Sequence, residues 1–415
     1  MEIFDPMHMT QFKFFFKNRI INKLKKIYVL NNVSCDMDSF LSAIILSVAR
    51  NLKEKTFIPL STNRNSPDDS LFETNMNAER IYLPLMNCKK GELKTRLDVN
   101  YLMREFNINE DDLYYIDEDE VVNDLNNSTD NLILVDHNTL HPTQASFSDL
   151  VIEIIDHHDD TNIKNNFYKN LKRKNLKFPL GSCTTLIIMD YVLCDIYINK
   201  IITKIINPLV LVSGILLDTE YFKKEFYINR WVNLDFYVYE RILIDHFDQE
   251  FEKISNIVFC FYEKLVNSKY DESGNLSLGV VNLMNKDKKC FKWGKILCEW
   301  SSLQIPLKSI TKKFGWNTVL DYFQKCKSSN ENISFYFTLS AYVKSELKIM
   351  TIYNYDNIID TKDLIDYLNL EFGEKMKKVK KKKNYDNKII KVYLDKTFSR
   401  KLLEPLINKY FEKFI

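Results

Sequence analysis

The sequence predicts an α/β fold in two domains, because the pattern of apolar runs and helical periodicity changes along the chain. Between residues 25 and 225, short apolar runs alternate with runs of helical periodicity, a pattern typical of buried parallel strands flanked by helices. From about residue 235, long helical stretches alternate with β-like runs such as LSLGVVNLM and NISFYFTLSAYV, which indicate a smaller α+β domain. A chain of 415 residues is long enough for two or three hydrophobic cores.

This pattern divides the chain into four predicted segments. Residues 1–24 are expected to be an N-terminal extension, because their short aromatic patch is not followed by a cleavage site. Residues 25–232 are assigned to the parallel-sheet domain, 233–250 to a helical connector and 251–415 to the second domain. Within the last segment, the basic run 374–388 (EKMKKVKKKKNYDNK) is predicted to be a solvated loop that is also available to an anionic ligand.

The overall composition favours an intracellular protein. The formal charge of +2 gives no global field for nucleic acid or membrane, and no segment has the uninterrupted apolar length of a membrane span. The eight cysteines are scattered without a CxxC spacing, which indicates reduced thiols rather than a zinc site. We therefore expect a cytoplasmic protein with no membrane or nucleic-acid partner.

The first apolar run, KIYVL, is expected to be a strand, and FLSAIILSVARNL is expected to be a helix. Between them lies NNVSCDMDSF, which contains Asn32, Asp36 and Asp38. In an open α/β sheet, ligands bind beyond the carboxyl ends of the strands, so this turn is a candidate site. The alternative is that both aspartates only cap the helix that begins near Phe40.

Polar residues also follow later apolar runs: Asp136 in LVDHN, Asp156, His157 and His158 in IIDHH, and Asp218 in SGILLDT. Because the ends of parallel strands meet at one edge, we expect these groups to converge. Carboxylates with one or two imidazoles suit magnesium, manganese or a related ion, and four carboxylates would repel one another without cations. The pattern therefore predicts a two-metal centre that hydrolyses a phosphoanhydride or phosphoester by activating a water.

The motifs NNVSCDMDSF, LVDHN, IDHH, GSCTT and SGILLDT, in this order, resemble the DHH-family phosphoesterases. The residues in these motifs are most similar to those of cytosolic exopolyphosphatases of the yeast type, with family II inorganic pyrophosphatases and the prune proteins as relatives. In the second domain, NKDKKCF, ILCEWSSLQIPL and SRKLLEP resemble the DHHA2-type domain of that group. The resemblance implies an active site in the cleft between a DHH domain and a DHHA2-type domain.

Carried onto this chain, the resemblance implies that Asp36 binds one cation, Asp38 binds the other, and Asp136 bridges both. His157 and Asp218 would complete the second site. Asn32, a weaker candidate ligand, stands where the pyrophosphatases carry histidine. Its harder amide oxygen tilts the site toward Mg²⁺, with Mn²⁺ or Co²⁺ possible.

The resemblance also implies substrate-binding groups. His158 would face the phosphate and donate to one of its oxygens, and Arg400 and Lys401 of the SRK motif would hold phosphates, since a guanidinium binds two phosphate oxygens at once. Ser399, Lys286 and Lys289 would extend this surface for a long polyanion. Without the resemblance, SRK would be read as a helix start followed by solvated charges.

The expected function is a metal-dependent exopolyphosphatase that releases terminal orthophosphate from linear inorganic polyphosphate. The alternatives are hydrolysis of pyrophosphate or short polyphosphates by the same centre, and a non-catalytic, prune-like scaffold. The scaffold reading predicts lost ligands, whereas every carboxylate is present, and the second histidine of IDHH also speaks against the prune branch. A nuclease is disfavoured because the chain has no adjacent glycines. The oligomeric state stays open, with a monomer favoured.

Overall fold

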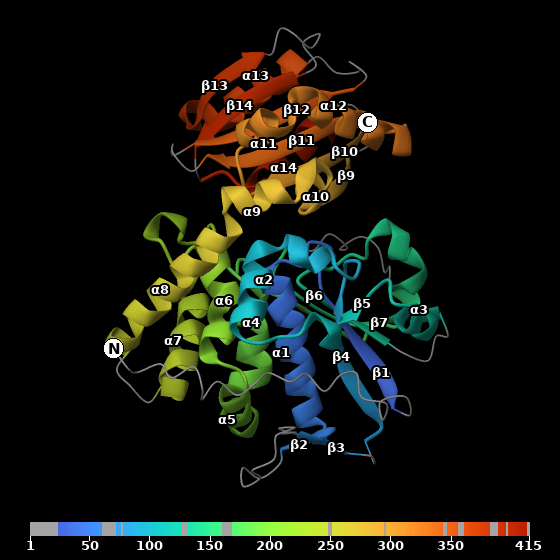
Figure 1. Ribbon diagram of the computed structural model, residues 1–415, viewed down its shortest axis with the longest axis vertical. Coiled ribbons are helices and arrows are strands. Elements are labelled where there is room, and N and C mark those ends of the chain that lie inside the picture. Colours follow the sequence, from blue (N-terminus) through green and yellow to red (C-terminus); the bar gives the residue numbers. More distant parts are fainter. Residues whose placement is uncertain are drawn as a thin grey trace. The chain divides into compact units, whose positions relative to one another are not determined.

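The computed structural model describes residues 24–59, 72–75, 78–126, 131–159, 168–247, 251–293, 296–342, 347–355, 361–381, 389–395 and 397–412. The chain divides into two compact units, Met1–Ser268 and Lys269–Ile415. The predicted α/β class, with a parallel-sheet domain followed by a second mixed-sheet domain, is confirmed (Figure 1). Most of the N-terminal extension and residues 382–388 of the basic run lie outside the described residues. The loop prediction is wrong for Met376–Lys381 of that run, which form a strand, β13, at the edge of the second sheet.

The first unit is built on a six-stranded sheet with the order β5-β4-β1-β6-β7-β8. All of its strand pairs are parallel. The strands are β1 (Lys25–Leu30), β4 (Arg80–Met86), β5 (Tyr114–Tyr115), β6 (Asn131–Val135), β7 (Val151–Asp156) and β8 (Arg173–Leu176), and a separate hairpin pairs β2 (Phe57–Pro59) with β3 (Phe72–Thr74). The chain fills one side of β1 first and then the other, so the strand order reverses beside β1. In such sheets the ligand crevice lies beyond the carboxyl ends of the strands at this reversal.

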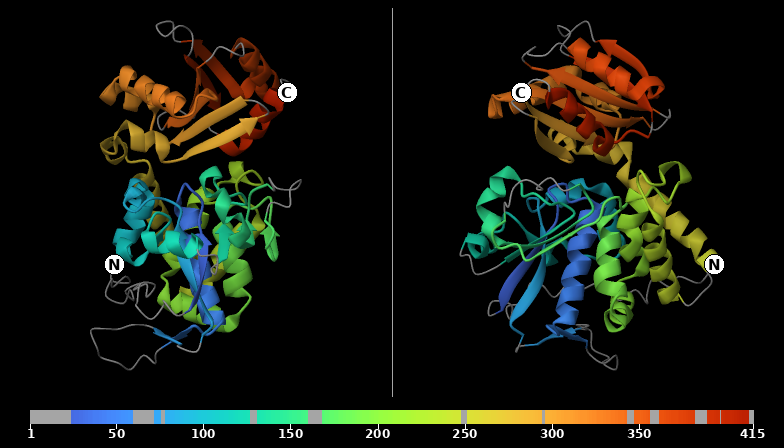
Figure 2. Two further views of the ribbon diagram at one scale, coloured as in Figure 1. Left: turned by 90° about the vertical axis from the view of Figure 1, so that its right-hand side faces the viewer. Right: turned by 180° about the vertical axis from the view of Figure 1, so that it is seen from behind.

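Helices cover this sheet, and α1 is central among them. Figures 1 and 2 show α1 beside the strands, with α4 and α6 on its far side. The helices of the unit are α1 (Met37–Lys53), α2 (Leu97–Glu105), α3 (Asp119–Asn126), α4 (Cys183–Ile187), α5 (Ile196–Ile205), α6 (Pro208–Asp218), α7 (Asn233–Phe247) and α8 (Phe251–Lys269), with a π-helical turn over Ile188–Leu193 after α4 and short 3-10 turns at Glu92–Thr95, Glu110–Asp112, Pro142–Leu150 and Lys224–Phe226.

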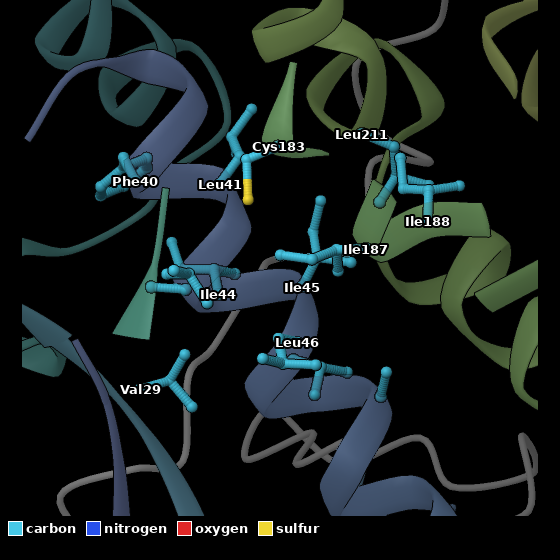
Figure 3. Close-up of a cluster of buried hydrophobic side chains, with 14 of the residues drawn as sticks. Val29, Phe40, Leu41, Ile44, Ile45, Leu46, Cys183, Ile187, Ile188 and Leu211 are labelled. Atoms are coloured by element: carbon cyan, nitrogen blue, oxygen red, sulfur yellow. The ribbon is translucent and has the colours of Figure 1, made fainter. Parts of the chain in front are cut away.

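The α1 helix is buried on all sides. Its apolar residues contact β1 on one side and α4, the π-helical turn and α6 on the other, as Val29, Ile45, Ile187 and Leu211 show in Figure 3. A helix that is apolar all round belongs in a core. Since α1 begins at the turn that carries the candidate ligands, this packing fixes the position of that turn.

The boundary between the units falls later than the sequence indicates. Residues 233–250 were expected to be a connector and 251–268 part of the second domain, but α7 and most of α8 belong to the first unit. The reason is their apolar faces: Val238 and Ile242 of α7, and Val258 and Leu265 of α8, are fully buried in the core of the first unit.

The second unit contains a mixed sheet with the order β13-β14-β12-β11-β10-β9, in which only β10 and β11 are parallel. Separate hydrophobic clusters lie on its two faces. Its strands are β9 (Lys288–Trp293), β10 (Ile296–Leu303), β11 (Ile333–Tyr342), β12 (Leu347–Asn354), β13 (Met376–Lys381) and β14 (Ile389–Asp395). Its helices are α9 (Glu272–Ser277), α10 (Gly279–Asn285), α11 (Leu307–Phe314), α12 (Trp316–Ser329), α13 (Thr361–Phe372) and α14 (Arg400–Phe411), with a 3-10 turn at Gly373–Lys375.

Two runs are helical where the sequence suggests strands. LSLGVVNLM lies in α9 and α10, because Val280, Leu283 and Met284 recur at helical spacing and are buried together. The run that ends in Asp218 is α6, which Asn207 caps by accepting from the backbone N–H of Leu209. The β-like reading of the first run and the strand-end reading of Asp218 are therefore wrong.

Among the described residues, no single helix has both the length and the apolar character needed to cross a membrane. The bent pair α5 and α6, at 95° to each other, meets that test only when the two helices are taken together.

Candidate metal centre

The candidate ligands of the first unit lie at the carboxyl edge of its sheet. Asn32 follows β1, Asp136 follows β6, and Asp156 ends β7 with two histidines after it. Asp38 lies in the first turn of α1, and Asp218 is the last residue of α6. Strands and core helices thus bring together residues that are far apart in sequence.

Asp136 occupies an unusual backbone conformation at the end of β6. Its φ is 60°, in the left-handed region that residues other than glycine seldom adopt. The backbone N–H of Asp136 donates to the carbonyl oxygen of Ile155 at 3.0 Å, and the Asn32 amide donates to Asp136 Oδ2 at 2.7 Å. Such backbone strain persists where the surroundings fix the residue, and it is common at functional sites.

The tautomer of His157 follows from its neighbours. Its Nδ1 lies 2.9 Å from the carbonyl oxygen of Leu180, which can only accept, so Nδ1 carries the proton. In the neutral ring, Nε2 then has a lone pair. That lone pair faces Asp136 Oδ1 at 3.1 Å and Asp38 Oδ2 at 3.8 Å. Three acceptors that face one another require a proton or a metal cation between them.

Asp38 is held by the GSCTT segment. Its Oδ1 accepts from the Ser182 hydroxyl at 2.6 Å and from the backbone N–H and hydroxyl of Thr184 at 2.8 and 2.6 Å. Its Oδ2 accepts from the backbone N–H of Cys183 at 2.7 Å and is the oxygen nearer His157. These four hydrogen bonds fix the orientation of the Asp38 carboxylate, which presents Oδ2 to the site.

The carboxylate of Asp156 positions His157 and His158. Asp156 is fully buried, and its Oδ1 accepts from His158 Nδ1 at 2.8 Å and from the backbone N–H of His157 at 2.8 Å. Asn138 donates to the other oxygen at 2.9 Å. Burial acts to raise the pKa of Asp156, but the hydrogen bond and charge of His158 outweigh it, so the pKa is lowered. Asp156 therefore stays ionised and fixes the orientation of His158.

Two groups in the described part of the chain have ligand atoms close enough to hold a metal ion. One contains Asp136, Asp156, His157 and His158, and the other contains Asp38, His157 and Asp218; the ligand atoms within each group lie within 4.8 Å of one another. The donor set also fits hard cations, because it consists of oxygens with one or two imidazoles. Beside it, the buried Oδ1 of Asn32 has no hydrogen-bond partner among the described residues.

The first-unit residues predicted from the sequence thus separate into two sets. Asp38, Asp136, His157, His158 and Asp218 lie within the close groups. Asp36 lies outside them, and its carboxylate caps α1 by accepting from the backbone N–H of Ser39 at 3.1 Å. Asn32 links the two sets, because its Nδ2 is 2.7 Å from Asp136 Oδ2 and 3.5 Å from Asp36 Oδ2.

Arg400 of the second unit is held by a carboxylate. Its guanidinium donates to Asp287 Oδ1 at 2.7 Å, to the Asp287 carbonyl oxygen at 2.8 Å and to the Trp300 carbonyl oxygen at 3.4 Å. The Arg400 side chain is 13% exposed. Its orientation is therefore set within the second unit.

The other residues predicted to bind substrate differ in exposure. Ser399 is the N-cap residue of α14, although its side chain makes no capping hydrogen bond. Lys286 is buried and donates to Asn275 Oδ1 at 3.1 Å, whereas Lys289 is half-buried in β9. The side chain of Lys401 lies outside the described residues.

The structure gives supporting roles to groups that the sequence did not assign to such roles. The sequence places Asp156 of the IIDHH motif among the carboxylates expected to converge, but its burial beneath the histidines could not be inferred from spacing. Ser182 and Thr184 stand in GSCTT, where hydroxyl residues at a helix start were the available signal. Cys183 lies beside them, and burial raises the pKa of its thiol well above the ordinary value, which argues against a nucleophilic role.

Comparisons with known proteins support the resemblance predicted from the motifs. Residues 26–214 match the DHH family, N-terminal domain. Exopolyphosphatase PRUNE1 of Rattus norvegicus is 31% identical over 129 residues, and that of Homo sapiens is 28% identical over 129 residues. Each match covers 31% of this chain and 24% of the relative, so the chain spans about a quarter of the length of these curated relatives.

A solved structure is similar over most of the chain. The putative family II inorganic pyrophosphatase of Methanococcus jannaschii superposes with a TM-score of 0.56 at 18% identity, covering 93% of this chain and 99% of that one. At this identity the likeness shows the fold.

Proposed function

Because residues 26–214 form a DHH-family N-terminal domain, we propose that the protein is a metal-dependent hydrolase of phosphoanhydride bonds. Its proposed activity is that of an exopolyphosphatase, which releases orthophosphate from the end of linear inorganic polyphosphate. The observation that carries the metal dependence is the lone pair of His157 Nε2, which faces Asp136 Oδ1 at 3.1 Å and Asp38 Oδ2 at 3.8 Å. A pair of divalent cations resolves this repulsion and suits the chemistry of phosphate transfer.

The residues of the first unit divide between the proposed cations. Asp36 and Asn32 would hold the first ion, Asp38 Oδ2, His157 Nε2 and Asp218 would hold the second, and Asp136 would be a ligand shared by both. When bound, the two ions lower the pKa of a water and neutralise phosphate oxygens. Asn32 can supply its Oδ1 only if its amide turns, because Nδ2 now faces Asp136 and Asp36. This oxygen-rich set favours Mg²⁺ and accepts Mn²⁺ or Co²⁺.

The chain's own groups then bind and orient the substrate. His158, whose Nδ1 is held by Asp156, is proposed to donate from Nε2 to a phosphate oxygen. Arg400 is proposed to bind phosphate from the second unit together with Ser399 and Lys401, and Lys286 and Lys289 to follow a longer chain. A fixed guanidinium suits this role, because a planar donor pair matches two phosphate oxygens.

The deciding experiment compares phosphate release from pyrophosphate, triphosphate and long polyphosphate, with Mg²⁺, Mn²⁺ or Co²⁺ and with Asp136→Asn as the background. An exopolyphosphatase releases orthophosphate from long chains at least as efficiently as from pyrophosphate. Activity confined to pyrophosphate or triphosphate would replace this substrate with the short-chain alternative. No release above the Asp136→Asn background, from any substrate with any metal, would favour the non-catalytic scaffold.

We also propose a cytoplasmic location and a monomeric state. The location follows from the scattered cysteines, which suit a reducing compartment. Fractionation of cells that express the tagged chain tests the location, and light scattering of the purified protein tests the monomer.

A further inference from the structure

Asp235, a buried carboxylate at the start of α7, hydrogen-bonds to residues 181–185, the segment that positions Asp38 of the proposed metal centre. Asp235 is fully buried. Its Oδ2 accepts from the backbone N–H groups of Gly181 and Val232, each at 2.9 Å, and its Oδ1 accepts from the Thr185 hydroxyl at 2.7 Å. Asp235 therefore joins the start of α7 to both ends of residues 181–185.

The segment 180–185 touches two of the proposed ligands directly. The carbonyl oxygen of Leu180 accepts from His157 Nδ1 and so determines which nitrogen of that ring carries the lone pair. Ser182, Cys183 and Thr184 provide four hydrogen bonds to the Asp38 carboxylate. Any shift of the segment would move a carboxylate and an imidazole of the centre at the same time.

The packing around Gly181 leaves this segment little freedom. A Cβ at this position would lie 2.6 Å from the carbonyl oxygen of Arg230, 3.0 Å from Asp235 Oδ2 and 3.0 Å from Thr219 Cγ2. Thr219 follows Asp218, so the same contact point adjoins the third ligand of the group. Only glycine allows the segment to approach Asp235 and Thr219 so closely.

The cost of burying Asp235 points to a specific task. Burial raises its pKa, and its three hydrogen bonds act in the opposite direction. A buried carboxylate is costly unless its hydrogen bonds are satisfied, and a valine or leucine would fill the space without that cost. What an apolar residue cannot do is orient two N–H groups and a hydroxyl at once.

We propose that Asp235 is a positioning residue for the metal centre: by fixing residues 180–185, it sets the orientation of Asp38 and the tautomer of His157. Its hydrogen-bond partners are Gly181, Val232 and Thr185, none of which is a proposed ligand. The inference rests on the proposed metal centre for its functional consequence, but the ordering of the segment is a property of the protein without metal.

The test uses the full chain and substitutions of matched size. Thr185→Val removes one hydroxyl that donates to Asp235, and Asp235→Asn removes the charge. Thr203→Val is the control, because the Thr203 hydroxyl is also partly buried but donates to Asn199 in α5 at 2.8 Å. Mn²⁺ affinity is measured by electron paramagnetic resonance, and hydrogen exchange of residues 181–185 is measured in the presence of chelator.

We expect Asp235→Asn to weaken Mn²⁺ binding about 10- to 100-fold, the usual cost of losing a group that supports a ligand, and Thr185→Val to weaken it about fivefold, as the loss of one hydrogen bond. In chelator, residues 181–185 should exchange faster in both variants than in Thr203→Val. If Asp235→Asn does not fold, Thr185→Val carries the test by itself.

Exchange and Mn²⁺ affinity in Thr185→Val that match those of Thr203→Val would overturn the positioning role. Failure of the wild-type protein to bind Mn²⁺ is a different result, because it would reject the proposed metal centre. The exchange measurement would then still decide whether Asp235 orders the segment.

Discussion

The candidate site residues of the two units differ in how their charged groups are arranged. In the first unit, electron pairs face one another: Asp136 Oδ1 and Asp38 Oδ2 lie 3.1 and 3.8 Å from His157 Nε2. In the second unit, cationic side chains meet acceptors of their own unit, as in the pair of Arg400 with Asp287 at 2.7 Å and the pair of Lys288 with Glu299 at 3.0 Å.

This difference indicates where an external charge is needed. The candidate metal centre of the first unit places two carboxylate oxygens near one imidazole nitrogen, which is expected of a site that cations complete. In the second unit, Asp287 holds Arg400 in one orientation before any ligand arrives. A preorganised cation loses less entropy when it binds a phosphate. We therefore predict that the first unit binds the cations and that Arg400 of the second unit binds phosphate.

The largest expected effect comes from removing charge where the first unit concentrates it. Asp136→Asn should lower phosphate release by more than about 100-fold, because metal-assisted chemistry is worth several kcal/mol. The strained backbone at φ 60° should tolerate the change, since asparagine enters the left-handed region readily. Circular dichroism is the check on the fold, and phosphate release is the readout. Activity above about one hundredth of wild type would contradict the two-metal reading.

The next effect lies in the second unit. Arg400→Ala should lower turnover or capture of polyphosphate about 10- to 100-fold, the range for losing charge-assisted hydrogen bonds. Mn²⁺ affinity should stay at the wild-type value. Asp287→Asn keeps the guanidinium but removes the charge that orients it, so a smaller loss is expected. Steady-state kinetics measure the loss of turnover and of substrate capture in both variants, and thermal stability is the control for folding. An Arg400→Ala enzyme with wild-type kinetics would remove SRK from the proposed site.

The sequence pattern predicted the parallel sheet and the ligands at its edge. Buried strands give continuous apolar runs, and a polar residue directly after such a run marks the carboxyl end of the strand. The same reasoning failed for Asp218, since a fully buried helix such as α6 is also apolar throughout and only its Asn207 cap distinguishes it. The observed domain boundary differs from the expected one for a similar reason. The apolar faces of α7 and α8 indicate that these helices are buried, but the sequence does not indicate which of the two cores they join.

The contacts that support the ligands could not be read from the sequence. Thr184 and Asp38 are 146 residues apart, and Asp235 and Gly181 are 54 residues apart. No local spacing relates such pairs. The role of Asp36 was ambiguous for the opposite reason, because a residue just before a helix satisfies the requirements of a cap and of a ligand equally well. In the structure the Asp36 carboxylate caps α1.

Metal binding should stabilise the two units unequally. Adding Mn²⁺ to the chelated protein should slow hydrogen exchange at the turn after β1 and around residues 180–185, and leave β10 to β12 of the second unit unchanged. At a free concentration 100 times its dissociation constant, an ion that binds only the folded state adds about 2.7 kcal/mol. Asp218→Asn, which removes one charge from the group of Asp38 and His157, should reduce the protection. Equal protection of both units by Mn²⁺ would contradict a centre confined to the first.

The smallest effect tests the one amide among the carboxylates. Asn32 now donates to Asp136 at 2.7 Å, and its own buried Oδ1 has no hydrogen-bond partner among the described residues. If this oxygen binds the first cation, that site contains only hard ligands and favours Mg²⁺. Asn32→His would introduce an imidazole, which suits Mn²⁺ and Co²⁺ better, so the ratio of Mn²⁺ to Mg²⁺ activity should rise by several-fold. Titration of both metals, on pyrophosphate and on long polyphosphate, measures the ratio and any shift toward the shorter substrate. Asn199→His is a suitable control, because the Asn199 amide also donates to a carboxylate, Asp245 Oδ2 at 2.9 Å, but joins α5 to α7. A ratio that is unchanged in Asn32→His would place Asn32 outside the metal site and leave it the role of holding Asp136 by a hydrogen bond.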